Sequence, residues 1–163
     1  MNKTAIVIVF VVVGVVGLML WSSPAQQSVG ADTGAASALA ATEILYDFGT
    51  ISMKDGNVTK DFTVTNPTGK DVFIPGLVTS CMCTKAFMVE PDGSTKGPFG
   101  MPGMGFVPPV NETIKAGASR VIRVVYDPNA HGPAGVGQID RIITLTDKSG
   151  GTLQLEIKAL VTP

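Results

Sequence analysis

The chain has 163 residues, of which 45% are hydrophobic, and its 12 basic and 13 acidic side chains nearly cancel. This length fits one domain of about 100 to 150 residues with an appendage. The charges are interspersed, with no block of like charge that would steer the protein to nucleic acid, and this argues against nucleic-acid binding.

The N-terminal segment is long and apolar. Residues 4–21 carry no charge and are dominated by Val, Ile, Leu and Phe. A helix of this length nearly crosses a hydrocarbon core of about 30 Å and exceeds the roughly 7 to 15 apolar residues of a secretory signal. We therefore predict a single-pass membrane anchor at residues 1–21, with the domain outside the cytoplasm because Lys3 favours the cytoplasmic side. The alternative is a cleaved signal, with small residues at 23–25 or 38–40 at the cleavage site, which would leave the protein periplasmic or secreted.

A polar segment follows the apolar one. Residues 22–42 are rich in Ser, Ala, Gln and Gly, with Asp32 as their one charge. This composition predicts a flexible linker to a folded domain at residues 43–163. An Ala-rich helix at residues 35–41 would be too short to be stable alone.

From residue 43 onward, short β-prone runs alternate with Gly, Pro, Asn and Asp. The alternation is clearest near the end, where Leu153, Leu155 and Ile157 share one face of a strand. The predicted strands are residues 43–48, 58–65, 71–79, 83–89, 119–126, 139–146 and 152–161, and the last two form a hairpin across residues 147–151. About seven short strands in this length predict an all-β fold, an immunoglobulin-like antiparallel β-sandwich.

One interval breaks this regular spacing. Residues 90–111 form a Gly- and Pro-rich stretch that contains two Phe and two Met. Long loops without secondary structure are uncommon in compact domains and are usually functional or disordered. Because disordered segments are poor in aromatic residues, we expect this loop to pack against the domain.

The order of several short motifs resembles that of a known family. The motifs are Asp47-Phe48-Gly49-Thr50-Ile51, Phe62-Thr63-Val64-Thr65-Asn66, Thr79-Ser80-Cys81-Met82-Cys83-Thr84, Lys115-Ala116-Gly117 and Val124-Val125-Tyr126-Asp127-Pro128. Over residues 43–161 this order is similar to the domain-of-unknown-function family 1573, bacterial immunoglobulin-like domains similar to ASH and major-sperm-protein-like modules. The resemblance implies an extracytoplasmic β-sandwich and lends no catalytic residues. The common family form has Gly between the two cysteines, where this chain has Met82.

Cys81 and Cys83 are the only cysteines of the chain. In extended backbone their Cα atoms would lie about 6.6 Å apart, near the upper end of disulfide geometry, and the bond would enclose one residue. A structural disulfide is therefore the least favoured interpretation. The pair could instead be buried as small apolar residues, or cycle between dithiol and disulfide in an oxidising compartment. Against the redox role, the two-residue spacer at a helix start, which lowers a thiol pKa, is missing.

A metal site is the remaining interpretation. Two thiolates about 4 Å apart can share an ion at metal–sulfur distances near 2.3 Å, and Cys together with Met selects copper(I) over zinc. We predict a copper(I) site formed by Cys81, Cys83, Met101, Met104 and His131, with Met82 and Met88 as further available donors. Taken singly, the methionines fit packing roles and His131 fits a surface loop, so this prediction depends on their meeting in space.

No catalytic motif accompanies these residues. The chain has one His, and it lacks both a Gly-x-Ser-x-Gly elbow and a phosphate-binding glycine loop before a helix. We therefore expect a non-enzymatic, membrane-tethered binding or scaffolding module of the bacterial cell envelope, with an envelope protein as its partner. The second hypothesis is a copper(I)-handling protein built on the same sandwich.

Overall fold

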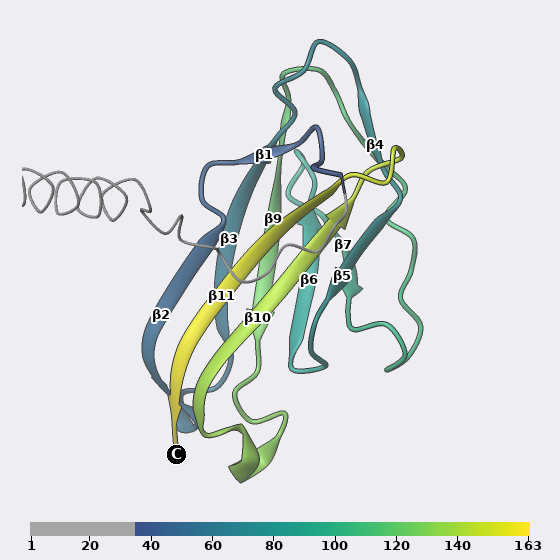
Figure 1. Ribbon diagram of the computed structural model, residues 1–163. Helices are drawn as coiled ribbons and strands as arrows, with labels where there is room; N and C mark the ends of the chain where they lie inside the picture. The colour runs from purple at the N-terminus through teal and green to yellow at the C-terminus, as the bar shows by residue number, and fades with distance from the viewer. Residues whose placement is uncertain (1–34) are drawn as a thin grey trace, which may run out of the picture. The chain divides into compact units, whose positions relative to one another are not determined.

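The computed structural model describes residues 35–163, drawn in colour in Figure 1. The predicted membrane anchor at residues 1–21 and the first part of the predicted linker, residues 22–34, lie outside the described residues. Across residues 35–163, no helix has the length and apolar character needed to cross a membrane. The helices described there are two short 3-10 turns, η1 (Met53–Asp55) and η2 (Gly132–Gly135).

The described chain is all-β and forms two main sheets that face each other as a sandwich (Figure 1). The five-stranded sheet has the order β1 (Ala40–Ala41), β3 (Val58–Thr65), β9 (Ser119–Tyr126), β6 (Thr84–Val89) and β7 (Thr95–Phe99). The four-stranded sheet has the order β2 (Leu45–Ser52), β11 (Thr152–Thr162), β10 (Gly137–Thr146) and β5 (Gly76–Thr79). A separate ladder joins β4 (Val72–Ile74) to β8 (Glu112–Ile114). The sandwich class predicted from the sequence is confirmed.

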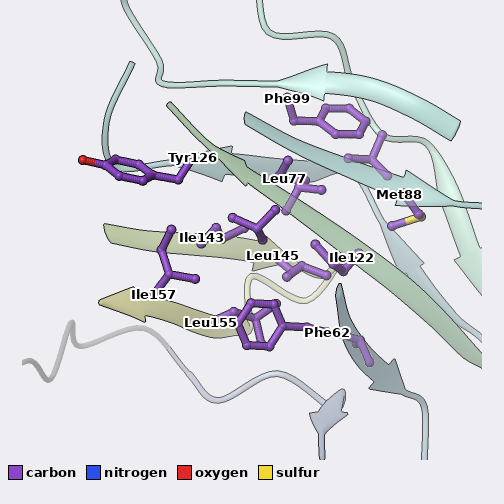
Figure 2. Close-up of a cluster of buried hydrophobic side chains, with 14 of the residues drawn as sticks. Phe62, Leu77, Met88, Phe99, Ile122, Tyr126, Ile143, Leu145, Leu155 and Ile157 are labelled. Atoms are coloured by element: carbon purple, nitrogen blue, oxygen red, sulfur yellow. The ribbon is translucent and has the colours of Figure 1, made fainter. Parts of the chain in front are cut away.

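The core fills the space between the two sheets. Alternate residues of each strand point inward, so Phe62 of β3 and Ile122 of β9 meet Ile143 of β10 and Leu155 of β11 in one buried cluster (Figure 2). Burial of each such large apolar side chain contributes roughly 1.5 to 3 kcal/mol to stability. The inward residues of β11 are the ones that the sequence alternation predicts.

The β10–β11 hairpin is also confirmed, and one carboxylate organises its turn. The strands pair from Gly137 opposite Val161 to Thr146 opposite Thr152. The Asp147 carboxylate accepts hydrogen bonds from the N–H groups of Ser149 and Gly151, at 2.9 and 3.0 Å. These N–H groups close the turn around the side chain of Asp147, which is buried at 4% exposed.

Three features of the sheets differ from the prediction. β2 pairs with β11 in parallel, so the sandwich is not wholly antiparallel. The predicted strand at residues 71–79 is interrupted at Pro75, whose missing N–H cannot extend a ladder, and the two halves join different sheets. The long loop at residues 90–111 contains the edge strand β7, which pairs with β6, so this segment packs on the domain as expected.

The linker predicted for residues 22–42 is part of the sandwich in its described portion. Ala40 and Ala41 pair with β3, and Leu39 is buried in the core at 6% exposed. Ser37 donates from its hydroxyl to Asp147 Oδ2 at 2.7 Å. The domain therefore begins before residue 43, because strand pairing and a long-range hydrogen bond outweigh the flexibility that the composition indicates.

Candidate metal site at the β5–β6 turn

The two cysteines lie in the turn that carries the chain from β5 in one sheet to β6 in the other. The Thr84 N–H donates to the Cys81 carbonyl oxygen at 3.1 Å, which closes the turn. The Thr79 hydroxyl donates to the carbonyl oxygens of Cys81 and Thr84, at 3.1 and 3.0 Å. The backbone at the cysteines is thus a braced turn and not the extended strand that the sequence interpretation assumed.

Cys81 and Cys83 form a disulfide, with an Sγ–Sγ distance of 2.13 Å and Cα atoms 5.2 Å apart. The prediction that disfavoured this bond is wrong. It assumed extended backbone, whereas the turn brings the Cα atoms well inside the usual range of about 4.4 to 6.8 Å. Since the bond encloses one residue, it removes little entropy from the unfolded chain and contributes little to stability. Cys83 is 2% exposed, and Cys81 is half-buried.

His131 reaches the sulfur pair from the loop between β9 and β10. Its Nε2 atom lies 3.2 Å from Cys81 Sγ. Asn129 shapes this loop, because its N–H donates to Asp127 Oδ1 at 2.8 Å and its side-chain amide donates to the Met53 carbonyl oxygen at 2.7 Å. The imidazole is therefore held against one sulfur while it stays exposed to solvent.

The loop with Met101 and Met104 lies beside the same turn. The Thr79 N–H donates to the Gly100 carbonyl oxygen at 3.1 Å, which fixes the start of the loop at the end of β5. The Met104 N–H donates to the Met101 carbonyl oxygen at 3.3 Å and closes a turn in which Gly103 has a φ of +84°. Glycine suits this left-handed position because it has no Cβ to clash.

These segments surround one open pocket of about 440 Å³. The residues that line it come from three regions far apart in the sequence: Ser80, Cys81, Met82, Met101, Met104, His131 and Arg141. None of these described lining residues carries a carboxylate, so the donors are sulfur, imidazole and one hydroxyl. Such a donor set suits soft metal ions and not the hard cations that need oxygen ligands.

The two cysteines and the histidine form a compact cluster. One ligand atom each from Cys81, Cys83 and His131 lie within 4.8 Å of one another. The bonded sulfurs, 2.13 Å apart, must separate to about 4 Å before both can bind one ion at metal–sulfur distances near 2.3 Å. Because a metal is bound by the thiolate, the ligand set exists only after the disulfide is reduced.

The structure brings all five residues of the predicted site to this turn. Met82 also lines the pocket, at 41% exposed. Met88 does not take part, because its place on the inward face of β6 buries it completely in the core. Whether the cluster binds a metal stays a prediction.

Sequence reasoning missed Arg141, although a signal was present. Arg141 lies on the same face of β10 as Ile139, Ile143 and Leu145, all of which are buried. A charged residue among the inward-facing positions of a strand indicates a buried partner. Here that partner is sulfur, because Arg141 Nε donates to Cys83 Sγ at 3.2 Å.

No family model and no curated protein matches the chain. Among solved structures, a protein of unknown function from Porphyromonas gingivalis W83 is similar at 14% identity and a TM-score of 0.54, over 78% of this chain and 46% of that one. A family 123 glycoside hydrolase from Clostridium perfringens is similar at 8% identity and a TM-score of 0.51, over 72% of this chain and 23% of that one. PapD-like domain 7 of human CEP192, an ASH/PapD-like domain, is similar at 10% identity and a TM-score of 0.48, over 78% of this chain and 87% of that one.

These likenesses concern the fold. This chain spans less than half of the first protein and about a quarter of the second. At such low identity the two structures with TM-scores above 0.5 support a β-sandwich and say nothing of activity. The resemblance to family 1573 stays a prediction, because no family model matches.

Proposed function

We propose that this chain is a non-enzymatic binding module of the bacterial cell envelope that holds copper(I) at the β5–β6 turn. One observation carries the proposal. Both cysteines and the single histidine form one cluster, and Met101 and Met104 line a pocket with Cys81 and His131, although these residues are separated by up to 50 positions in the sequence. Their chance of meeting is small if each has an unrelated packing role, because the loops that carry them could have ended on any face of the sandwich.

The choice of copper(I) follows from the donor types. Thiolate and thioether sulfur are soft ligands that select copper(I), and imidazole is compatible with it. Met101 and Met104 line the same pocket as Cys81 and His131, so a thioether could complete the coordination of an ion held by Cys81, Cys83 and His131. Zinc sites of four protein ligands usually have no thioether among them.

Reduction of the disulfide is the condition for binding. Two electrons and two protons convert the Cys81–Cys83 disulfide to two thiols, and the two thiol protons leave when the sulfurs bind the metal. A dithiol protein or a small thiol would supply the electrons. The disulfide also supports an oxidising, extracytoplasmic address, to which an uncleaved anchor at residues 1–21 would tether the domain.

Copper(I) titration tests the proposal. The full-length protein is kept in a mild non-ionic detergent because of its apolar N-terminal segment, reduced with a phosphine, freed of the phosphine, and titrated without oxygen against a chromophoric copper(I) chelator. We expect one copper(I) per chain, and an affinity at least about 100-fold lower when Cys81→Ser and Cys83→Ser are combined. The same protein with its disulfide intact is the matched control and should bind as weakly as the double variant. Failure of the reduced protein to compete with the chelator, or equal affinity in the serine variant, would sink the proposal.

A second candidate function is protein scaffolding. β2 is an edge strand of the four-stranded sheet, and within the described residues only β11 pairs with it. An open edge can accept a strand from a partner, in this case an envelope protein. The register shift opposite Lys158 and the positive φ of Gly49 mark a bulge in β2, however, and bulges protect edges from such pairing. Absence of copper(I) binding in the titration would favour this second function.

A further inference from the structure

Arg141 has an unusual position for a charged side chain. It stands on the inward face of β10 between Ile139 and Ile143, both of them buried. Its Nε donates to Cys83 Sγ at 3.2 Å, and its Nη1 donates to the Asp140 carbonyl oxygen at 2.8 Å. The guanidinium is therefore in contact with the sulfur pair, and Arg141 lines the same pocket as Cys81 and His131.

Within residues 35–163, no carboxylate forms an ion pair with the positive charge of Arg141. None of the ion pairs between side chains of residues 35–163 includes Arg141, and no carboxylate lines the pocket. A partly buried charge without a counter-charge is costly. In the disulfide form Arg141 Nε donates to a neutral sulfur, whereas reduction to thiolates would supply the missing negative charge.

The charges of a loaded site then depend on the valence of the ion. Two thiolates, a neutral imidazole and neutral thioethers carry a charge of −2, so copper(I) leaves −1 and Arg141 brings the total to zero. A divalent ion such as zinc(II) already neutralises the thiolates, and Arg141 then leaves an excess of +1 beside the metal. Arg141 repels every bound cation, but it repels a divalent one more strongly.

We infer that Arg141 is a specificity-determining residue, which makes this site prefer a monovalent soft ion over a divalent one. The inference rests on the proposed copper(I) function and names the group that gives it selectivity. Arg141 does this by fixed charge and is not itself a ligand, since a guanidinium stays protonated and has no lone pair to offer. It also orients Cys83 through the hydrogen bond to the sulfur.

The test compares two metals in one set of proteins. Copper(I) and zinc(II) are titrated separately into the reduced full-length protein, each against its own competing chelator, and the ratio of the two affinities is the readout. Arg141→Gln should lower the copper(I)-to-zinc(II) ratio about 10- to 100-fold, because a unit charge a few ångströms from the ion acts at an effective dielectric constant of about 20. Arg141→Lys keeps the charge and should retain most of the ratio. Lys148→Gln removes one positive charge from the turn beyond the far end of β10 and should leave the ratio unchanged.

The possible outcomes separate the inference from the proposed function. Wild-type protein that binds no copper(I) contradicts both. Wild-type protein that binds copper(I), together with an unchanged ratio in Arg141→Gln, overturns only the role of Arg141. The inference is also overturned if Arg141→Lys and Arg141→Gln shift the ratio equally, because the hydrogen-bond geometry and not the charge would then matter. Should Arg141→Gln fail to fold, Arg141→Leu removes the charge, keeps an apolar stem without adding a sulfur ligand, and replaces it in the comparison.

Discussion

The β10–β11 turn and the β5–β6 turn show opposite uses of polar groups. At the β10–β11 turn, the single carboxylate of Asp147 accepts hydrogen bonds from the turn itself and from Ser37 and Ala38, which lie more than 100 residues away. At the β5–β6 turn, the sulfurs of Cys81 and Cys83 each have one side-chain nitrogen at 3.2 Å, and the rest of the cluster is an open pocket. The β10–β11 turn is closed by its hydrogen bonds, whereas the β5–β6 turn faces an open pocket, and its sulfurs become available as ligands once the disulfide is reduced.

This difference indicates that the two turns serve different ends. A buried acceptor whose hydrogen bonds are all made stabilises the fold and offers nothing to a ligand. A cluster of sulfur and imidazole groups that faces an open pocket contributes little to the stability of the fold and is suited to ligand binding. Substitutions at the Asp147 turn should therefore change the free energy of unfolding without changing copper(I) affinity, and substitutions around the cysteines should do the reverse.

The largest expected loss of stability comes from Gly151→Ala. A Cβ at Gly151 would lie 2.7 Å from Asp147 Oδ2, 2.8 Å from Ser37 Cα and 2.9 Å from the Ala36 carbonyl oxygen. Two of these neighbours are backbone atoms, so the segment at residues 36–37 must shift, and we expect a destabilisation of about 3 kcal/mol. Denaturant unfolding of the full-length protein measures it.

Gly69→Ala is the matched control for this substitution. A Cβ at Gly69 has no neighbour within 4 Å and its φ is not in the left-handed region, so stability should hardly change. Copper(I) affinity should be unchanged in both variants. A parallel loss of copper(I) affinity in Gly151→Ala would show that the two turns are coupled, and the contrast between them would fail.

A smaller loss is expected from Asp147→Asn, and it should depend on pH. Burial alone would raise the pKa of Asp147, but hydrogen bonds from Ser149, Ser37 and the N–H groups of Gly151 and Ala38 outweigh it and lower the pKa to about 2. A carboxyl with a lowered pKa stabilises the fold above its unfolded pKa of about 3.9. This stabilisation, about 2 kcal/mol, is lost as the pH falls from about 4 to 2. Asp147→Asn should remove it at neutral pH and flatten stability over that window, as measured by thermal unfolding at a series of pH values.

Asp92→Asn is the control for the same local motif. Asp92 accepts from the N–H and hydroxyl of Ser94 at 2.9 and 2.7 Å, as Asp147 does from Ser149, but it lies on the surface and has no long-range donors. Its substitution should have little effect at any pH. An equal effect of the two substitutions would mean that the local turn, and not the link to Ser37, carries the stability.

The strands could be read from the sequence because their signals are local. The alternation of Leu155 and Ile157 with polar residues, and the glycines after Asp147, predict the β10–β11 hairpin correctly. The parallel pairing of β2 with β11 could not be predicted, since it joins segments about 100 residues apart and leaves no periodic mark in either. The same holds for Ala40 and Ala41, whose composition indicates a linker and whose partner strand decides otherwise.

Only part of the candidate site could be predicted from the sequence, because its residues are brought together by the fold and not by local pattern. The residue types at Cys81, Cys83 and His131 are compatible with a soft-metal site, but the prediction depends on their meeting in space, which no local pattern shows. The disulfide was misjudged because a strand was assumed where the Thr84 N–H closes a turn. For Arg141 the sequence shows a charge on the buried face of β10, but its partner, Cys83 Sγ, is revealed only by the fold.

The smallest expected effects are those of Met101→Leu and Met104→Leu on copper(I) affinity. Met104 is 57% exposed at the rim of the pocket, whereas Met101 is half-buried, so Met101 has less freedom to lose on binding an ion. Met101→Leu should weaken copper(I) binding about tenfold and Met104→Leu by less, because each removes one weak thioether ligand and keeps the apolar volume. Neither should alter the free energy of unfolding.

Met88→Leu is the control, since it changes a thioether that is buried in the core. Equal copper(I) affinity in all three variants would restrict the site to the two cysteines and His131, and it would leave the Met101 loop as a cover for the turn.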